Sequence, residues 1–467
     1  MRILKKITIF VFCSILLLPV FTFNTKENAI SEIDNRALAQ NPLAVDSGED
    51  FTIAVENYVN DRIGFRNEMI LDYTILNDKL FGEMVHPSYT YGKDGYVFGA
   101  GLDMGIHYDE YHEAFADMVK KVQDYCDERS IPFLFVFNPS KPAVMTEYIA
   151  EGINYNREWV DEFLAALAER GVRYLDNTET LKAVKDAGEN GFNQKYDANH
   201  WNDIGAYYGT NAMLEELKQD IPTIHVNTEG DVTFIEQKQE SLLVSRFPID
   251  EMVPVANIAA EFEDLSEYYS SELELDKSYN AFGYYLNPQR IEEGAPKALV
   301  FQGSYMNVYG YRYLQNAFGQ YIYVHDYQNV LNFPHYYNIF KPDCVIFEVA
   351  EYTLSDGYFN FERMKELQFN FPYSTAVSVT EKSEEYMPLE DIEVSRGESL
   401  TKLDWTCTEK LEQGWMLMGN SEYDLIRTKT GYTVTVLTEE YDKYKDELEM
   451  AGFSDGTMMH WRKEKLS

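Results

Sequence analysis

The run Ile131-Pro-Phe-Leu-Phe-Val-Phe137, closed by Asn138-Pro139, decides the fold class of this chain. Almost every residue in the run is apolar, as is typical of a central strand that is buried on both faces of a parallel sheet. A helical pattern over residues 111–129 precedes it, and an amphipathic helix over 159–170, ended by Gly171, follows it. Helix, strand and helix in this order predict an α/β domain.

The same alternation continues along the chain. Further strands are expected at 172–175, 298–301, 321–324 and 344–349, with helices at 205–218 and 309–318. We therefore predict a three-layer α/β sandwich around a central parallel sheet. Residues 221–295 are less periodic and rich in Glu, Asp and Ser, which indicates an irregular excursion from the sheet.

A chain of 467 residues exceeds what one hydrophobic core usually supports. We therefore expect a main domain of about 250 to 300 residues with appended pieces. The predicted units are an export segment at 1–30, a helical segment at 31–105 packed on the main domain, the main domain at 106–394, and a small α+β subdomain at 395–467.

The N-terminus has the pattern of an export segment. Basic residues in Met1–Lys6 precede a mostly apolar run over Ile7–Phe23, and polar sequence follows. The run is near the shortest length that spans a bilayer, and no small-x-small cleavage motif clearly follows it. A membrane anchor and a cleaved signal peptide both fit, and either one places the rest of the protein outside the cytoplasm, anchored or secreted.

The charge and cysteine content exclude several classes of function. The formal net charge of -38 repels phosphate backbones, so we expect no nucleic-acid partner. The acidity is most simply explained as a solubility device. Beyond the export segment, Cys126, Cys344 and Cys407 are odd in number and lack CxxC spacing, which indicates neither a zinc site nor a disulfide framework.

Ser304 is the candidate nucleophile. In Leu299-Val-Phe-Gln-Gly-Ser-Tyr305 it follows an apolar strand and Gly303, where the chain turns at the carboxyl edge of the sheet. Ligands bind at that edge in open α/β folds, and backbone N–H groups of such a turn can face a developing oxyanion. A strand followed by Gly-Ser also occurs in ordinary loops, so this motif alone does not decide the function.

His200 and Asp197 are the candidate base and acid. In Tyr196-Asp-Ala-Asn-His-Trp-Asn202 a carboxylate precedes an imidazole by three residues, so Asp197 can accept the Nδ1 proton and leave Nε2 free as a base. Alternatively, His200 caps the following helix or packs under Trp201. An α/β domain that contains both this pair and a strand-edge serine favours a catalytic triad.

Several other short motifs accompany these residues between about positions 33 and 355. They are Asn35-Arg36, Tyr58-x-x-Asp61-Arg-x-Gly-Phe-Arg66, Gly92-Lys-Asp-Gly95, Pro139-Ser-Lys141, His200-Trp201 with Gly205-Ala-Tyr207, Gly303-Ser304 and Glu348-Val-Ala-Glu-Tyr352. The series resembles the AlgX/AlgJ-like branch of the SGNH hydrolases, which includes the DHHW proteins and alginate O-acetylation factors. In that branch the acid and base precede the nucleophile in the chain, as they do here.

The chain departs from this family pattern at two places. The family usually has Asp-x-His-Trp and Gly-Asp-Ser-Phe, whereas this chain has Asp197-Ala-Asn-His-Trp201 and Gln302-Gly-Ser-Tyr305. Other SGNH enzymes pair acid and base across Asp-x-x-His, so the first departure is compatible with function. Without the aspartate, Gln302 or Gly303 is expected to hold the nucleophile turn.

The resemblance and the predicted sheet edge suggest further residues with substrate-binding or supporting roles: Lys141, Trp201, Gln302, Gly303, Tyr305, Glu351 and Tyr352. Lys141 either lines the cleft and binds a sugar carboxylate or is structural. Glu351 and Tyr352 either face the site or bond to neighbouring loops. His325 and Asp326 are a reserve base and acid, with an ordinary loop as the alternative.

The resemblance implies an extracytoplasmic O-acetyltransferase that acetylates hydroxyls of a cell-surface or secreted polysaccharide. Ser304 would attack the acetyl donor, His200 would move the proton, and Asp197 would orient His200. The donor would come from a membrane-bound O-acyltransferase (MBOAT) partner, and no metal or other cofactor is required. The alternatives are a polysaccharide acetylesterase with the same triad and an inactive glycan-binding scaffold of an exopolysaccharide synthesis complex. The oligomeric state is left open.

Overall fold

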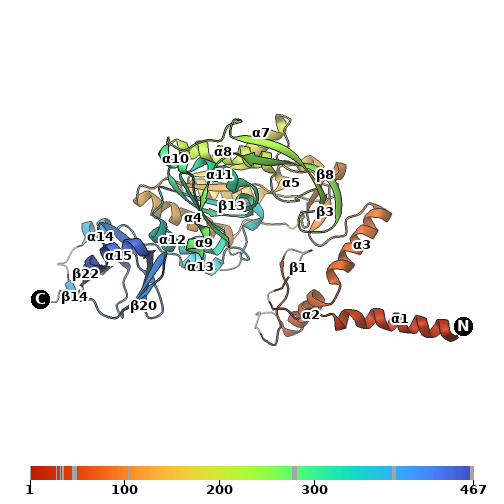
Figure 1. Ribbon diagram of the computed structural model, residues 1–467, viewed down its shortest axis with the longest axis horizontal. Coiled ribbons are helices and arrows are strands. Elements are labelled where there is room, and N and C mark those ends of the chain that lie inside the picture. Colours follow the sequence, from red (N-terminus) through yellow and green to blue (C-terminus); the bar gives the residue numbers. More distant parts are fainter. Residues whose placement is uncertain are drawn as a thin grey trace.

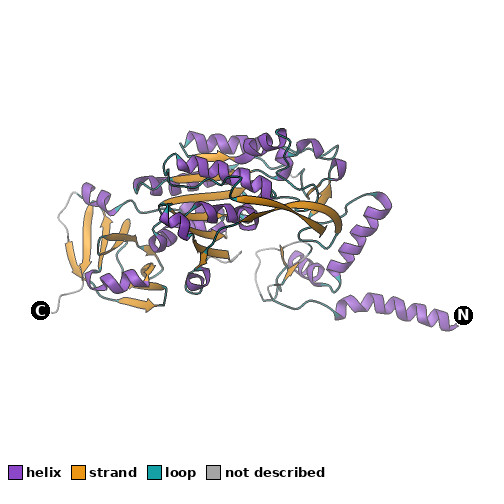
Figure 2. Ribbon diagram, turned by 45° about the horizontal axis from the view of Figure 1, so that its top comes forward, coloured by secondary structure: helices purple, strands orange, loops and turns teal. Residues whose placement is uncertain are grey.

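The computed structural model describes residues 2–27, 29–31, 33, 36–44, 50–103, 105–275, 281–325, 327–380 and 385–462. Asn35 of the family motifs and Asp326 of the reserve pair lie outside these residues. The main body is an α/β sandwich whose central sheet is covered by helices (Figure 1, Figure 2). The predicted fold class is therefore confirmed.

The central sheet contains seven strands among the described residues, in the order β6-β5-β13-β11-β12-β10-β9. The first five in this order are parallel and are β6 (Tyr174–Asp176), β5 (Phe133–Asn138), β13 (Cys344–Ala350), β11 (Lys297–Gln302) and β12 (Gln320–His325). At one edge, β10 (Ala281–Leu286) pairs antiparallel with β12, and β9 (Glu263–Asp264) pairs antiparallel with β10. Part of the expected excursion thus returns to the sheet, which is mixed rather than wholly parallel.

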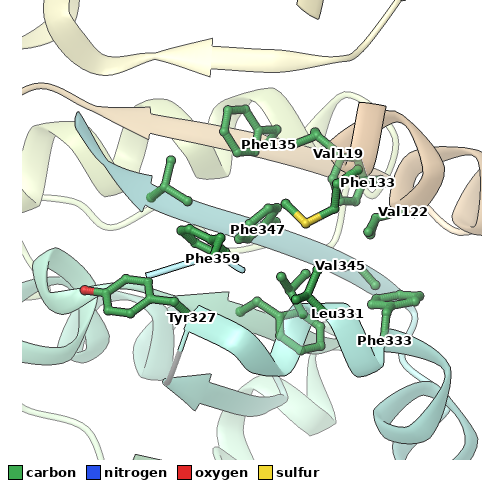
Figure 3. Packing of buried hydrophobic residues seen from close by; sticks show 14 of the residues in the cluster. Val119, Val122, Phe133, Phe135, Tyr327, Leu331, Phe333, Val345, Phe347 and Phe359 are labelled. Carbon is green, nitrogen blue, oxygen red and sulfur yellow. The ribbon is translucent and has the colours of Figure 1, made fainter. Parts of the chain in front are cut away.

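The apolar run that predicted the central strand packs on both faces of the sheet. Phe133, Phe135 and Phe137 of β5 belong to one hydrophobic cluster, and Leu134 and Val136 belong to another. This division follows from the alternation of side chains along a strand. Figure 3 shows the first cluster, in which rings of β5 and β13 meet side chains of the covering helices.

Different helices contribute to these two clusters. Helices α4 (Glu110–Glu128), α6 (Glu158–Glu169), α12 (Phe333–Phe340) and α13 (Phe361–Glu366), with the 3-10 segment η4 (Tyr327–Asn332), contribute to the first. Helices α5 (Lys141–Val144), α7 (Asn177–Asp186), α8 (Asp203–Lys218) and α11 (Tyr311–Ala317), with the π-helical segment η3 (Met306–Gly310), contribute to or pack beside the second. Short 3-10 turns η2 (Thr146–Tyr148) and η5 (Glu351–Thr353) complete the body.

The segment expected to be an irregular excursion is built around a long hairpin. Strands β7 (Val232–Ser241) and β8 (Pro248–Ile258) pair antiparallel with a register shift near Gln239, and short helices α9 (Ser266–Ser270) and α10 (Pro288–Glu292) flank β10. Many side chains of the hairpin are exposed, which explains why no hydrophobic period marks it in the sequence.

The N-terminal helices precede the body. They are α1 (Arg2–Phe21), α2 (Phe51–Arg62) and α3 (Arg66–Phe81), with the small strand pairs β1 (Ile30–Ser31)–β2 (Arg36–Ala37) and β3 (Tyr89–Tyr91)–β4 (Val97–Gly99) and the turn η1 (Lys93–Gly95). Figure 1 shows α1 extending away from the body. Its segment Ile3–Phe21 is long and apolar enough to cross a membrane, with a mean hydropathy of 2.2 and none of the window buried.

The C-terminal unit consists mainly of two sheets in which most strand pairs are antiparallel. One has the order β14-β22-β21-β17-β18 and the other β15-β16-β20-β19. The elements are α14 (Tyr373–Val379), β14 (Glu385–Pro388), β15 (Ile392–Arg396), β16 (Leu400–Thr406), β17 (Gln413–Met418), β18 (Ser421–Asp424), β19 (Ile426–Arg427), β20 (Gly431–Leu437), α15 (Thr438–Tyr444), η6 (Lys445–Glu447), β21 (Glu449–Ser454) and β22 (Thr457–Arg462). The strands begin about ten residues before position 395, where we placed the boundary.

A buried polar contact joins this unit to the main body. The guanidinium of Arg129, at the end of α4, lies 3.6 Å from the ring centroid of Tyr125 and 3.6 Å from a carboxylate oxygen of Asp424 on β18. Asn338 of α12 donates to the backbone carbonyl of Asp424 at 2.8 Å and accepts from its N–H at 2.8 Å. Charges buried in this way are stable only when paired, so the contact holds the two units in one relative position.

Candidate active site

The candidate nucleophile lies at the start of a helix. Strand β11 ends at Gln302, Gly303 turns the chain, and Ser304 begins the helical stretch that continues through η3 and α11. The first turn of a helix carries unpaired backbone N–H groups and the positive end of the helix dipole. Ser304 is therefore placed where negative charge on a reacting oxygen is stabilised.

The structure brings Ser304, His200 and Asp197 together. The Nε2 atom of His200 lies 2.8 Å from Ser304 Oγ, and its Nδ1 atom lies 2.9 Å from each carboxylate oxygen of Asp197. These distances are within hydrogen-bond reach, and the chain of contacts allows the imidazole to accept the serine proton while the carboxylate fixes its orientation. His200 and Ser304 are partly exposed, whereas Asp197 is buried.

The conformation of Asp197 accommodates the additional residue in the Asp-x-x-His spacing. Its φ is +59°, in the left-handed region that aspartate tolerates better than most residues. The carboxylate also accepts the backbone N–H groups of Asn199 at 3.2 Å and His200 at 3.0 Å. Burial opposes ionisation most strongly, but the charge of His200 and these hydrogen bonds hold the pKa of Asp197 below its ordinary value.

Glu251 of the β7–β8 hairpin holds the loop that leads to Asp197. Its two carboxylate oxygens accept the backbone N–H groups of Gln194, Lys195 and Tyr196 at 2.7, 2.9 and 2.6 Å. A carboxylate that accepts several backbone N–H groups makes charge-assisted bonds that fix the backbone. Sequence reasoning missed Glu251 because its segment has no clear period and is distant in sequence from the triad.

Glu348 holds the nucleophile turn in place of the absent aspartate. Its carboxylate accepts the N–H of Gly303 at 2.6 Å and the side-chain amide of Asn138 at 2.7 Å, and Asn177 donates to Asn138 at 2.8 Å. Burial raises the pKa of Glu348 to about 7. The side-chain oxygen of Gln302, expected to hold the turn, instead accepts from Tyr321, and the Gly303 amide is occupied by Glu348.

Tyr352 contacts both the nucleophile and the base. Its hydroxyl lies 2.6 Å from Ser304 Oγ and 3.0 Å from His200 Nε2. Burial raises the pKa of Tyr352 well above its ordinary value, so the hydroxyl stays protonated and can donate a hydrogen bond. A second tyrosine, Tyr309, donates to Asp197 at 3.2 Å. Sequence reasoning included Tyr352 and missed Tyr309, which lies on the helix after Ser304.

The other aromatic residues of the predicted set support the loops. Trp201 is fully buried and donates its indole N–H to the carbonyl of Tyr305 at 3.2 Å. The Tyr305 hydroxyl lies 2.7 Å from the carbonyl of Pro139 and 2.6 Å from that of Asn199. These contacts join the loop of the base to the turn of the nucleophile.

Two further predicted residues bond away from the triad. Buried Glu351 accepts from Arg157 at 3.1 Å, from the backbone N–H of Ser140 at 3.0 Å and from Tyr155 at 3.2 Å. His325, the reserve base, is buried with its Nδ1 atom 2.8 Å from the carbonyl of Gln302. These observed contacts are with neighbouring loops and strands, which fits supporting roles.

Lys141 is buried rather than in the cleft. It has no exposed surface, and its Nζ atom donates to the carbonyls of Val97 at 2.7 Å and Gln194 at 3.1 Å. Burial lowers the pKa of Lys141 to about 7. This position leaves no surface for a sugar carboxylate, so the structural alternative agrees better with the geometry.

Replacing Lys141 with Met is expected to lower the free energy of unfolding by about 2 kcal/mol, because two backbone carbonyls lose their donor. The KM for an acetyl ester substrate should change little. Urea unfolding and steady-state kinetics of the full chain measure both, with exposed Lys182→Met as the matched control. A raised KM with unchanged stability would instead favour substrate binding by Lys141.

Within the described part of the chain, no group of three or more His, Cys, Asp or Glu side chains is arranged to hold a metal ion. The contacts of Ser304 with His200, and of His200 with Asp197, instead provide the arrangement of an activated serine.

This fold is typical of SGNH-hydrolase-like domains. In it, a serine lies at the start of a helix after a central strand, and the histidine that contacts it comes from a loop earlier in the chain. Residues 90–271 match the family model described as SGNH hydrolase-like domain, acetyltransferase AlgX. This match over residues 90–271 agrees with the resemblance that the sequence motifs indicated, to the AlgX/AlgJ-like branch of the SGNH hydrolases. The matched segment contains Asp197 and His200 and ends before Ser304.

Solved structures with a related fold have low sequence identity to this chain. The O-acetyltransferase domain of Pseudomonas putida AlgJ is 13% identical with a TM-score of 0.40, covering 60% of this chain and 99% of its own. Bacillus cereus PatB1 with a sulfonyl adduct is 17% identical with a TM-score of 0.43, covering 58% and 97%. A DHHW family protein from Eubacterium siraeum is 14% identical with a TM-score of 0.42, covering 61% and 97%. No curated protein matches the chain.

Proposed function

We propose that this protein is an extracytoplasmic O-acetyltransferase that moves an acetyl group onto a hydroxyl of a cell-surface or secreted polysaccharide. The observation that carries the proposal is the continuous contact from Ser304 Oγ through His200 to Asp197, at 2.8 and 2.9 Å. The acetyltransferase family model that matches residues 90–271 supports the reaction class.

In this mechanism Ser304 Oγ forms a bond to the acyl carbon of the donor while its proton passes to His200 Nε2. Collapse of the tetrahedral intermediate breaks the bond to the leaving oxygen, which takes the proton from His200 and leaves an acetylated serine. An acceptor hydroxyl then attacks the acyl carbon and gives its proton to His200. The second tetrahedral intermediate breaks the bond to Ser304 Oγ, which takes that proton back from His200. The ionised Asp197 stabilises the imidazolium that forms in both steps.

The hydroxyl of Tyr352 is the donor that we propose for the oxyanion. It is protonated, and at 2.6 Å from Ser304 Oγ it lies beside the position of the tetrahedral carbon. The Gly303 amide is occupied by Glu348 and so cannot serve without breaking that bond. The hydrogen bond from Tyr352 to Ser304 would transfer to the substrate oxygen as negative charge develops there.

The proposed location is the outer face of the membrane, with α1 as an uncleaved anchor. The apolar segment Ile3–Phe21 supports a span, and the folded unit includes residues directly after it. Asn24, for example, donates its N–H to the carbonyl of Arg62 at 2.8 Å. A membrane-bound acyltransferase of the MBOAT type is the donor partner proposed from the family resemblance, with a polysaccharide as acceptor.

The test of this function is detection of the acyl-enzyme. The full chain in detergent is mixed with p-nitrophenyl acetate, quenched in acid and digested for mass spectrometry. We expect one added acetyl group on the peptide that contains Ser304, and faster nitrophenol release with accumulation of acetylated sugar when an acceptor oligosaccharide is present. Absence of this acetyl-serine under conditions of turnover would contradict the mechanism.

The same experiment separates the two enzymatic alternatives. An acetylesterase forms the acetyl-serine and releases acetate at a rate that an added oligosaccharide does not change, because water is its acceptor. An inactive scaffold forms no acetyl-serine yet binds glycan. The partly exposed Ser304 hydroxyl, already bonded to an imidazole, favours an enzyme over a scaffold.

A further inference from the structure

The end of α1 is fixed to the turn between α2 and α3. The carbonyl of Pro19 accepts the N–H of Gly64 at 2.9 Å, and the Arg62 guanidinium donates to the carbonyls of Asn24 at 3.2 Å and Lys26 at 2.6 Å. The two segments also touch closely, because a Cβ atom added at Gly64 would lie 1.8 Å from Thr22 Oγ1. The start of α3 is thus held at the end of the segment that we propose to span the membrane.

Helix α3 has an exposed apolar stripe on the side away from its buried face. Phe65, Met69, Tyr73, Leu76 and Leu80 are 46, 48, 56, 54 and 63% exposed. The spacing of four, three and four residues from Met69 to Leu80 places these four side chains on one face of the helix, and Phe65 is the N-cap residue that precedes it. The opposite side carries the buried residues Thr74 and Asn77.

The stripe continues into an apolar hollow beside the helix. This hollow, of about 750 Å³, is lined in part by Tyr73 of the stripe and by Met84, Val85 and Leu102. Val85 itself is 41% exposed. Contiguous exposed apolar surface is uncommon on a soluble protein and indicates a contact with a membrane or with another protein.

The charges near the stripe indicate how it could bind a membrane. Glu68 and Asp72 border the stripe on one side together with Lys79, so no excess of basic residues accompanies it. With a formal net charge of -38, the whole chain is repelled by anionic headgroups. Contact would therefore rest on burial of apolar side chains in the boundary between headgroups and acyl chains.

We propose that the stripe of α3 lies in the outer interface of the same bilayer that α1 spans. Residues Phe65 to Leu80 form a second, interfacial membrane contact beside the span. Figure 1 shows α3 as the connection between the α1–α2 junction and the main body. Docking of this helix would fix the orientation of the body above the membrane, which a single spanning helix does not. The inference rests on the proposed location and is independent of the acyl-transfer chemistry.

Matched pairs of neighbouring residues on α3 test this placement. The exposed thiol of Cys13 and the half-buried thiol of Cys407 are first removed by Cys13→Ala and Cys407→Ser, and Cys126 and Cys344 are buried. Four variants of the full chain then each carry one new cysteine, which is labelled with an environment-sensitive fluorophore. The first pair is Met69→Cys and Glu68→Cys, and the second pair is Leu80→Cys and Lys79→Cys. Each pair has one residue on the stripe and one beside it, at nearly equal positions along the helix axis.

The labelled chains are reconstituted into phosphatidylcholine vesicles that contain lipids with nitroxides near the headgroup. We expect lipid quenching at Met69→Cys and Leu80→Cys to exceed that at Glu68→Cys and Lys79→Cys by at least about twofold, with no increase when anionic lipid is added. Circular dichroism of each labelled chain verifies that it is folded.

Equal lipid quenching within both pairs, in chains that float with the vesicles, would overturn the proposal. Photo-crosslinks from stripe positions to a membrane protein, without lipid quenching, would also overturn it and assign the stripe to a protein partner. Chains that do not float with vesicles would refute the anchor and this inference together. None of these outcomes bears on formation of the acetyl-serine, so failure here is distinguishable from failure of the proposed enzyme activity.

Discussion

Replacing His200 with Ala is expected to lower acetyl turnover by about four to six powers of ten. The Nε2 atom of His200 lies 2.8 Å from Ser304 Oγ, and its Nδ1 atom lies 2.9 Å from the Asp197 carboxylate. Without it the serine proton has no acceptor of suitable pKa, since the nearby Tyr352 hydroxyl is itself protonated. Initial rates of nitrophenyl acetate hydrolysis and of transfer to an oligosaccharide measure the effect.

The exposed residue His107 provides the matched control for this experiment. His107→Ala should retain the parent rate and stability. His200→Ala should unfold at a somewhat lower temperature than the parent, because buried Asp197 loses the partner that keeps it ionised, but it should remain folded at the assay temperature. A His200→Ala protein that stays folded and transfers acetyl groups within about tenfold of the parent rate would exclude the triad mechanism. Loss of folding would appear in the unfolding curve rather than as a clean kinetic defect.

Replacing Glu348 with Gln is expected to lower turnover by about 10- to 100-fold. The glutamine offers only one acceptor oxygen to two donors, so either the Gly303 N–H or the Asn138 amide faces an NH₂ group. The nucleophile turn then loses part of its support. The kcat should fall more than KM rises, because the change affects the position of Ser304 rather than an exposed binding surface.

The same substitution should remove a pH dependence of stability. Burial raises the pKa of Glu348 to about 7 from an ordinary value of 4.5, so the folded state binds a proton that the unfolded state releases. The resulting stability is fully present below pH 4.5 and is lost as the pH rises through 7, by an amount of up to about 3 kcal/mol. Urea unfolding of Glu348→Gln between these pH values should show a correspondingly smaller decrease.

The exposed residue Glu362 on α13 provides the control for this measurement. Glu362→Gln should follow the parent at every pH. If the Glu348→Gln and parent proteins have parallel stability curves, the carboxyl does not titrate in this range. If turnover is also unchanged, the Gly303 contact is unimportant for the reaction.

The sequence was informative about the fold wherever burial imposes a period. The runs of β5, β11 and β13 were recognisable because both faces of a parallel strand are covered, so nearly every residue is apolar. The hairpin β7–β8 was not recognisable, because it is largely exposed and its alternation is weak. Strand β10 was also not recognised, although Phe282 and Tyr284 are buried and the strand lies next to the sheet edge, between β12 and β9.

The candidate triad could be predicted from the sequence. Ser304 directly follows a predicted strand, and the Asp197–His200 pair lies in the loop before a predicted helix, so the α/β topology was expected to bring the three residues together. Residues that hold the triad were harder to find, since their roles depend on long-range contacts. Glu348 and Gly303 are 45 positions apart, and Glu251 is more than 50 positions from the loop it binds. The inference that Gln302 or Gly303 holds the turn considered only neighbours in sequence.

The Glu251 contact also limits how the β7–β8 hairpin can be altered. Shortening the hairpin so that Glu251 is lost would remove the acceptor for three backbone N–H groups that precede Asp197. Those groups would turn to water, and the acid would lose the backbone that sets its left-handed conformation. The length of the hairpin and the position of Asp197 are therefore not separable design variables, and variants that alter one should be screened for the other.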